Sequence, residues 1–433
     1  MFRSYFDVRM FLVSPILRIA TVLVCGASLV VTAVPLRATV PPPAETDVRG
    51  MWVLRTSLTS PASIAAMVSA AKAAGMNTLL VQVRGRGEAF YKSEIEPRAT
   101  ELARQPESFD PLQTTLDLAH QAGLRVHAWV NVNLVSSAAV LPRSRDHVAH
   151  RHPEWLMTPR ALADELRKIG PQSPAYVGTL SRWVRANVES TEGLYLSPIT
   201  PAAQAYSVSV IRELLDRYAV DGLHLDYIRY PNAEFDFSAA AIAQFRAAEL
   251  HGVPAAERER LDRAAAGDAA AWPRAFPDAY AAFRVDRLTA LVARINAEAR
   301  AARPALTISA AVVPDASEAL RGRLQNWSGW AAQGYLDVVC PMIYTTDAAE
   351  FSALAAKARR SLGATPMWAG IGAYRLPVTR TAAHVQLARK AGAAGVLLFS
   401  YDSLIGATAP SPNYLLALRS TLVDTAAGDG SRR

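Results

Sequence analysis

Short apolar runs alternate with longer amphipathic segments along most of the chain, beginning at Arg49. The short runs are rich in β-branched residues and have the length of buried strands, whereas the longer segments repeat their apolar residues with the period of a helix. Strands are predicted at residues 51–55, 77–84, 124–131, 221–228, 306–313, 336–344, 365–372 and 394–401. Helices are predicted at residues 61–74, 110–122, 201–218, 282–302, 317–333, 349–362, 380–391 and 413–424. This order predicts an α/β protein with a (β/α)8 TIM barrel.

The residues at the start of the predicted helices, and the segment after the first predicted strand, support the barrel. Ser60, Asp110 and Thr200 each precede a proline, which is the pattern of an N-cap followed by proline at the first helical position. The rival fold is a doubly wound open sheet, which needs a glycine-rich turn after its first strand to bind a nucleotide. The segment RTSLTSPAS, which follows the first predicted strand, contains no glycine.

Two long segments, 132–200 and 232–280, follow the third and fourth predicted strands. Both leave the carboxyl ends of strands, where the active sites of barrels are built. We therefore expect them to be variable insertions with some helix of their own that also form walls of a substrate cleft.

The N-terminal region has the pattern of an export signal. Arg3, Arg9 and Arg18 precede the apolar run IATVLVCGASLVVTAV, which is short for a membrane span. Val31-Thr32-Ala33 ends it with small residues, so we expect cleavage after Ala33. We expect a signal peptide at 1–33, a Pro-rich linker at 34–48, the barrel at 49–425 and a disordered tail at 426–433. The expected location is secreted or periplasmic, with membrane attachment only if the signal stays uncleaved.

Composition excludes some classes of partner. The chain is 51% hydrophobic and 19% charged, with a formal net charge of +8. The basic residues alternate with acids on predicted helices, which is typical of solvated helix surfaces, so nucleic-acid binding is not expected. With the signal removed, Cys340 is the only thiol and no internal disulfide can form. No cofactor is expected.

The strand DGLHLDYI, at residues 221–228, carries polar residues where a barrel strand is usually apolar. Alternation places Gly222, His224, Asp226 and Ile228 on one face. Because the face under the helices must be apolar, we expect His224 and Asp226 to point to the barrel axis. A buried carboxyl there needs a partner, or its pKa rises and it becomes a proton donor. A His–Asp pair that only stabilises the barrel is the alternative.

Other polar and aromatic residues fall on the same predicted rim. The strand ends that carry Arg84, Asn131, Asp226 and Tyr344 are expected to converge on one pocket. Trp129 is either a core residue or a platform for a sugar ring. The expected substrate-binding residues are Arg84, Trp129, Asn131, His224, Arg229, Tyr344 and Tyr401.

Six segments together resemble the glycosyl hydrolase-like 10 family of secreted bacterial proteins. They are RGMWVLRTS, MNTLLVQVRGRGEAFYKSEIEP, FDPLQTTLDLAHQAGLRVHAWVNV, HPEWLM, YLSPITPAAQAYSVSVIRELLDRYAVDGLHLDYIRYP and LDVVCPMIYTTD, and they span roughly residues 49–400. The resemblance implies a (β/α)8 barrel and a glycosidase that acts on an oligosaccharide or polysaccharide of bacterial origin, peptidoglycan strands among them. A more distant similarity joins DGLHLDYI to the chitinase motif D-G-x-D-x-D-x-E. Because Ile228 replaces the final acid, the substrate-assisted chitinase mechanism is not expected.

Glycoside hydrolysis generally needs two carboxyl groups. Asp226 is expected to be one of them, as nucleophile or charge stabiliser. For the second, the strand ends offer Glu88, Asp315, Asp347 and Asp402. Asp315 and Asp347 are favoured because their strands lie close to the fourth in barrel order, although each also has the sequence context of a helix cap.

Two other classes of function remain open. His127, His224 and Asp226 on one interior suggest a metal-dependent hydrolase, but the usual spacing of metal ligands is missing and no metal is expected. The missing glutamate also leaves a non-catalytic glycan-binding barrel as an alternative.

Overall fold

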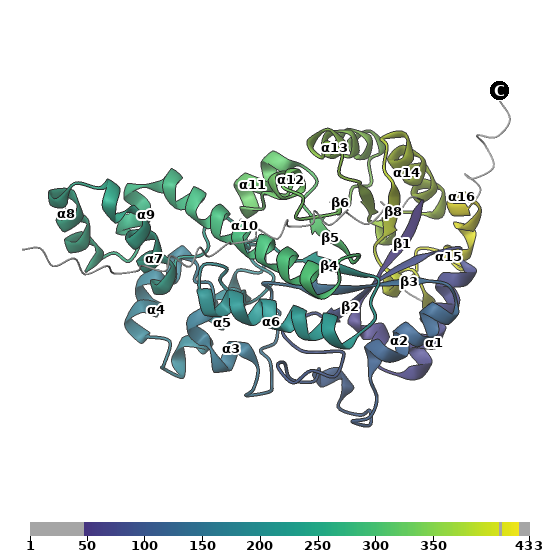
Figure 1. Ribbon diagram of the computed structural model, residues 1–433, viewed down its shortest axis with the longest axis horizontal. Coiled ribbons are helices and arrows are strands. Elements are labelled where there is room, and N and C mark those ends of the chain that lie inside the picture. Colours follow the sequence, from purple (N-terminus) through teal and green to yellow (C-terminus); the bar gives the residue numbers. More distant parts are fainter. Residues whose placement is uncertain (1–46, 407–408, 424–433) are drawn as a thin grey trace, which may run out of the picture. The chain divides into compact units, whose positions relative to one another are not determined.

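This computed structural model describes residues 47–406 and 409–423. In this part of the chain, eight parallel strands close into a barrel (Figure 1). The strands are β1 (Val48–Val53), β2 (Thr78–Arg84), β3 (Arg125–Asn131), β4 (Gly222–Asp226), β5 (Thr307–Val312), β6 (Val338–Ile343), β7 (Trp368–Ile371) and β8 (Gly395–Leu398). They pair in chain order, and β8 closes the barrel against β1. Each overlaps a strand expected from the sequence, so the (β/α)8 prediction is confirmed.

Side-chain alternation divides the core into two layers. The residues that pack inside the barrel include Trp52, Leu80, Trp129, Cys340, Trp368 and Leu397. The opposite faces of the strands pack against the helices in the main apolar cluster, which includes Leu79, Leu225 and Ile308. The register of β3 with β4 pairs Trp129 with His224 and Asn131 with Asp226. Polar side chains of neighbouring strands therefore end side by side at the carboxyl rim of the barrel.

Helices cover the outside of the barrel (Figure 1). Those of the repeating units are α1 (Pro61–Ala73), α2 (Pro111–Gln121), α6 (Pro201–Arg217), α10 (Pro277–Ala302), α11 (Ala316–Arg323), α12 (Trp327–Ala332), α13 (Ala348–Ser361), α14 (Val378–Lys390), α15 (Tyr414–Ala417) and α16 (Arg419–Val423). Short 3₁₀ helices are η1 (Arg55–Leu58), η2 (Thr100–Leu102), η3 (Pro153–Trp155), η4 (Arg160–Leu162), η5 (Leu250–Gly252), η6 (Ala373–Arg375) and η7 (Tyr401–Ser403). Ser60 and Asp110 cap α1 and α2 through their side chains, whereas α6 starts at Pro201 without a side-chain bond from Thr200.

The single helix expected at 317–333 is in fact two helices, α11 and α12. Leu324 ends the first of them in a left-handed conformation, with φ of 53°. Asn326 then starts the second, because its side chain accepts a hydrogen bond from the backbone N–H of Gly329. The periodicity of the apolar residues continues across this break, which is why the pattern did not reveal it.

The two long segments fold as expected into insertions with helices of their own. Segment 132–200 carries α3 (Val148–Arg151), α4 (Ala163–Ile169) and α5 (Ala175–Ala186), and segment 232–280 carries α7 (Ala239–Glu249), α8 (Ala255–Ala265) and α9 (Ala271–Ala275). The second insertion supports the first through backbone hydrogen bonds. The N–H of Phe237 donates to the carbonyl of Thr158 at 2.8 Å, and the N–H of Arg160 donates to the carbonyl of Glu234 at 2.9 Å. The buried carboxylate of Asp236 also accepts the Thr158 N–H.

The expected signal peptide and C-terminal tail lie outside the described residues, as does the expected linker except for Asp47 and Val48. Val48 is already part of β1, so the barrel begins one residue earlier than expected. No helix in the described part of the chain is both long and apolar enough to cross a membrane.

Candidate active site

A cavity of about 400 Å³ opens at the carboxyl ends of the barrel strands. Strand residues and the residues just after them supply most of its wall: Trp52, Leu54, Gln82, Gly85, Trp129, Asn131, Asp226, Tyr227, Ala311, Met342, Tyr344 and Phe399. The first insertion adds Leu134, Ser137 and Glu192, so it is a wall of the cleft as expected. Among the described residues, none from segment 232–280 lines this cavity. The expectation that the second insertion also forms a wall is therefore wrong.

Asp226 and Glu192 lie on either side of one buried guanidinium, that of Arg229. Nη1 of Arg229 is 3.3 Å from Oδ1 of Asp226, and Nη2 is 3.4 Å from Oε1 of Glu192. Because both nitrogens belong to one rigid planar group, the contacting oxygens of the two carboxylates are at most about 9 Å apart. Such a separation allows the two carboxyl groups to act on the same bond of a bound ligand.

Local backbone structure fixes the position of each carboxyl group. Asp226 is the last residue of β4, and its Oδ1 also accepts the N–H of Tyr227 at 2.6 Å. Glu192 lies near the end of the first insertion, where its backbone carbonyl accepts the N–H of Ala138 at 2.8 Å. The hydroxyl of Tyr195 donates to Oε2 of Glu192 at 2.6 Å. Glu192 is therefore held from both sides, although it lies on a loop.

The surroundings shift the pKa values of the two carboxyl groups in opposite directions. Burial raises the pKa of Asp226 above its usual 3.8, and it outweighs the guanidinium of Arg229. Burial acts on Glu192 too, but there the guanidinium of Arg229 and the hydroxyl of Tyr195 outweigh it and lower the pKa below 4.5. Asp226 is thus the group that keeps a proton more readily, and Glu192 is the group that stays ionised.

Aromatic rings line the cavity next to these acids. Trp52 and Phe399 have ring centres 6.0 Å apart, and Phe399 and Tyr344 have theirs 5.4 Å apart. The indole N–H of Trp129 donates to Oδ1 of Asn131 at 2.9 Å, which fixes both side chains. Burial and the negative charge of Asp226 raise the pKa of Tyr344 well above 10.0, so its hydroxyl stays protonated and can donate a hydrogen bond.

His224 lies below the cavity rather than in its wall. The indole N–H of Trp52 donates to Nε2 of His224 at 3.0 Å, which makes Nδ1 the protonated nitrogen. Nδ1 then donates to Oγ of Ser309 at 2.9 Å. Burial lowers the pKa of His224 to about 3, so the imidazole is neutral. Both nitrogens are engaged inside the barrel, so His224 joins strands across the barrel instead of facing a ligand.

The same contacts bear on the metal-dependent alternative. His224 has no nitrogen left for a metal, since Trp52 and Ser309 occupy both. Among the described residues, no group of three or more His, Cys, Asp or Glu side chains is placed to hold a metal ion. We therefore derive no metal chemistry for this cavity.

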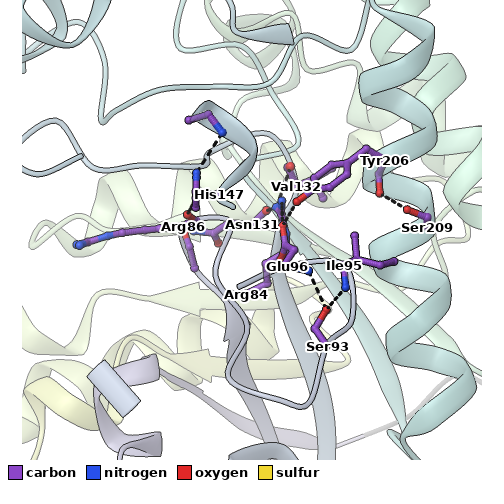
Figure 2. A network of polar contacts seen from close by, with 12 residues as sticks. Arg84, Arg86, Ser93, Ile95, Glu96, Asn131, Val132, His147, Tyr206 and Ser209 are labelled. Carbon is purple, nitrogen blue, oxygen red and sulfur yellow. Dashed lines mark hydrogen bonds and ion pairs between the residues drawn. The ribbon is translucent and has the colours of Figure 1, made fainter. Parts of the chain in front are cut away.

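Arg84 points away from the cavity. The pairing of β2 with β3 shifts register between Gln82 and Arg84, so Gln82 lines the cavity and Arg84 does not. Figure 2 shows Arg84 against Glu96, with Nη2 2.7 Å from Oε1, and the hydroxyl of Tyr206 donates to the same oxygen at 2.9 Å. The pair is almost completely buried, with side chains 1% and 0% exposed. The Arg84–Glu96 pair has a structural role, because it links the loop after β2 to α6.

The candidate second carboxylates also lie elsewhere. Asp315 caps α11 and pairs with Lys357, and Asp347 caps α13 by accepting the N–H of Glu350 at 2.7 Å. Asp402 accepts the N–H of Leu54, just after β1, and the hydroxyl groups of Thr56 and Ser57 in η1. None of these three carboxylates lines the cavity, and the helix-cap alternative noted for the first two is what the structure shows.

Some of the remaining expected residues line the cavity, and others lie elsewhere. Arg229 lines the cavity with Trp129, Asn131 and Tyr344. Tyr401, in contrast, is the first residue of η7 and is buried in the main apolar cluster. Glu88 lines a neighbouring cavity, where it accepts the hydroxyl of Thr100 at 2.9 Å and where burial raises its pKa.

Sequence reasoning missed Glu192, which no strand pattern marks. One signal near it was readable, the glycine that follows it. A Cβ at Gly193 would lie 1.7 Å from the carbonyl oxygen of Ser136, so the chain must pass very close to another backbone segment there. A glycine beside an acid in a long loop after a barrel strand is the pattern that could have pointed to this position.

Comparisons with known proteins identify the family of this chain. The family model described as "Glycosyl hydrolase-like 10" matches residues 47–379. The chain belongs to the glycosyl hydrolase-like 10 family. This membership confirms the resemblance seen in the sequence segments.

Curated relatives of this glycosyl hydrolase-like 10 chain include two bacterial proteins named as glycosyl hydrolases. DigH of Escherichia coli (strain K12) is 32% identical over 157 residues, which are 35% of this chain and 30% of DigH. YngK of Bacillus subtilis (strain 168) is 24% identical over 291 residues, which are 62% of this chain and 46% of YngK. The chain thus matches less than half the length of either relative.

Solved structures with the same fold include enzymes that act on sugars. The PgaB (BpsB) glycoside hydrolase domain from Bordetella bronchiseptica has a TM-score of 0.60 and 15% identity, over 88% of this chain and 99% of that domain. A GH42 β-galactosidase from G. stearothermophilus has a TM-score of 0.57 and 14% identity, over 88% of this chain and 57% of that one. At these identities the similarity establishes the barrel fold.

Proposed function

We propose that the protein is a glycosidase in which Asp226 and Glu192 form the pair of catalytic carboxyl groups. The observation that carries this proposal is the placement of both carboxylates on the guanidinium of Arg229, in a cavity at the carboxyl end of the barrel. Their opposite pKa shifts suit a division of labour in which Asp226 donates a proton to the leaving oxygen and Glu192 acts as the ionised partner. The family membership supports the reaction class.

In this mechanism the sugar ring lies against the aromatic wall formed by Trp52, Tyr344 and Phe399. Protonation of the glycosidic oxygen by Asp226 breaks the bond to the anomeric carbon, while Glu192 attacks that carbon or activates a water for the attack. The role of Asp226 differs from the nucleophile or charge stabiliser expected from the sequence, because its raised pKa suits a proton donor.

The proposed substrate is a bacterial cell-wall polysaccharide, and the proposed location is outside the cytoplasm. The export pattern at residues 1–33 supports both, since it would deliver the protein to the compartment that contains such glycans. The aromatic wall and the neighbouring polar side chains suit a sugar, which presents apolar ring faces and hydroxyl groups.

The test is digestion of a glycan panel with analysis of the products by mass spectrometry. The panel contains peptidoglycan strands freed of peptide, chitin oligomers, and other bacterial and plant polysaccharides. We expect cleavage by the wild type and a loss of at least about 100-fold in Asp226→Asn and in Glu192→Gln, with glycan binding retained.

The matched control for these variants is Asp286→Asn, an exposed acid of α10 that does not line the cavity, and it should keep full activity. Binding of glycans without any cleavage by the wild type would instead identify a non-catalytic glycan-binding barrel. Unchanged activity of Glu192→Gln would remove Glu192 from the catalytic pair.

A further inference from the structure

A second cavity, of about 280 Å³, lies next to the proposed catalytic cavity, and Arg86 lines both of them. We call it the side cavity. Its other polar wall residues are Glu88, Thr100, Glu101, Ser136 and Arg143. Two cavities that share a wall residue can bind consecutive units of one chain-like ligand. The side chain at their boundary then contacts the junction of those units.

Arg86 is a half-buried cation whose guanidinium has no ion pair or hydrogen bond among the described residues. The two other arginines of the catalytic cavity are engaged: Arg55 by Gln82 at 3.0 Å, and Arg229 by Asp226 and Glu192. Burial lowers the pKa of Arg86, and the charge of Arg55 adds to this. A guanidinium stays charged under all ordinary conditions, so this boundary holds a positive charge that the protein does not neutralise by direct contact.

Hydrogen bonds fix the backbone around Arg86. The amide of Asn131 donates to the carbonyl of Gly85 at 2.8 Å, and Nε2 of His147 donates to the carbonyl of Arg86 at 2.7 Å. Nδ1 of His147 accepts the N–H of Ala149, which settles which nitrogen carries the proton. Figure 2 shows the side chain of Arg86 extending away from Arg84 and Glu96.

Gly87 makes this close arrangement possible. Its φ is +69°, and a Cβ there would lie 2.6 Å from Nε2 of His147. A residue other than glycine would therefore push the histidine off the Arg86 carbonyl. The sequence RGRG thus presents one arginine from a backbone that is held on both sides, which is the arrangement expected of a preorganised binding group.

We propose that Arg86 binds a carboxylate carried by the sugar at the junction of the two cavities, so that the substrate is an acidic glycan long enough to occupy both. This inference rests on the proposed glycosidase function, because it names the class of glycan that the same site accepts. A guanidinium and a carboxylate match in shape and form two parallel hydrogen bonds.

The acids of the side cavity favour a singly charged group over a doubly charged one. Glu88 and Glu101 both line it, and both interact with the charge of Arg86. Neither glutamate forms an ion pair with Arg86, because Glu101 pairs with Arg55 at 3.4 Å and Glu88 accepts the hydroxyl of Thr100. The guanidinium of Arg86 is therefore free to pair with one carboxylate. A phosphate monoester would bring a second negative charge towards these glutamates, at an electrostatic cost.

The test compares one glycan in two chemical forms. Peptidoglycan strands freed of peptide carry free carboxylates on their lactyl groups, and carbodiimide activation followed by borohydride reduction converts these to alcohols. Binding of both forms is measured by calorimetry, in parallel with cleavage. We expect the wild type to bind the acidic strands about tenfold more tightly than the reduced strands. Arg86→Gln should bind both forms with the affinity that the wild type shows for the reduced strands.

Arg104→Gln is the matched control, because Arg104 is an exposed arginine that lines neither cavity. It removes the same net charge and should keep the tenfold preference. Equal affinity of the wild type for both forms, or an equal loss of preference in Arg104→Gln, would overturn the role of Arg86. Preference for acidic strands without cleavage by the wild type would overturn the glycosidase function alone.

A third set of ligands separates carboxylate from phosphate. Chitin oligomers carrying phosphate monoesters are compared with unmodified chitin oligomers, and we expect no gain in affinity from the phosphate. A gain that Arg86→Gln abolishes would assign the site to phosphate and overturn the carboxylate assignment.

Discussion

The guanidinium of Arg229 lies 4.2 Å from the centre of the Tyr227 ring. Stacking on this ring adds to the two carboxylate contacts and fixes the plane of the guanidinium between Asp226 and Glu192. Arg229 therefore sets both the separation and the charge balance of the proposed catalytic pair without itself exchanging a proton.

Replacement of Arg229 by methionine should destabilise the fold and shift the pH profile of activity. Removing one partner of a buried ion pair leaves an uncompensated charge, and we expect a loss of about 3 to 5 kcal/mol in the free energy of unfolding. The pKa values of Asp226 and Glu192 should both rise, because the cation that lowers them is gone. Urea unfolding and the pH dependence of kcat/KM measure these effects. Stability and pH profile like those of the wild type would contradict the structural role of Arg229.

Activity of the wild type should follow a bell-shaped dependence on pH. The reaction needs Asp226 protonated and Glu192 ionised, so activity falls at low pH through the lowered pKa of Glu192, below 4.5, and at high pH through the raised pKa of Asp226, above 3.8. A profile of kcat/KM against pH tests this. Activity that increases steadily into the alkaline range would show that Asp226 is not the proton donor.

Glu96→Gln should cost about 3 to 5 kcal/mol of stability, because it leaves the guanidinium of Arg84 buried without its counter-charge. Glu94→Gln is the matched control, since that side chain is 79% exposed and its pair with Arg217 should contribute only about 0 to 1 kcal/mol. Denaturant unfolding of both variants gives the comparison. Equal losses in the two variants would mean that burial does not decide the strength of the Arg84 pair.

The stability of the wild type should fall on acidification, in part because of His224. Its pKa is about 3 in the folded protein and about 6.5 when unfolded, so the unfolded state binds a proton that the folded state rejects. The contribution is fully present above pH 6.5, and about 2 kcal/mol of it is lost by pH 5. In His224→Gln, unfolding measured from pH 7 to pH 5 should show a smaller slope. His147, with its pKa lowered to about 4, adds a similar slope to both proteins. Identical slopes would show that His224 is not held neutral.

The sequence predicts the barrel well because its signals are local. Each strand is a short apolar run of its own, and the polar pair His224 and Asp226 is visible as an exception to that pattern. Alternation also places Trp129, Asn131 and Tyr344 correctly at the cavity, because the strands that carry them are regular. It fails for Arg84, where a shift in strand pairing that no residue pattern marks turns the side chain out of the cavity.

The partner of Asp226 could not be predicted for a different reason. Strand order favoured Asp315 and Asp347, but those acids satisfy the N-termini of α11 and α13. Glu192 lies in a loop, and its contacts with Ala138 and Arg229, both distant in sequence, hold it at the cavity. Contacts between residues distant in sequence are what a single sequence does not reveal.

The two carboxyl groups belong to parts of the chain that rest largely on different apolar clusters. Asp226 ends a strand of the barrel, whereas Glu192 ends an insertion whose own cluster includes Leu166, Leu180 and Val184. A small cluster on the outside of a barrel opens at a lower free energy than the barrel itself. Warming would therefore separate Glu192 from Asp226 while the barrel is still folded, so the protein should lose its activity at a lower temperature than its fold.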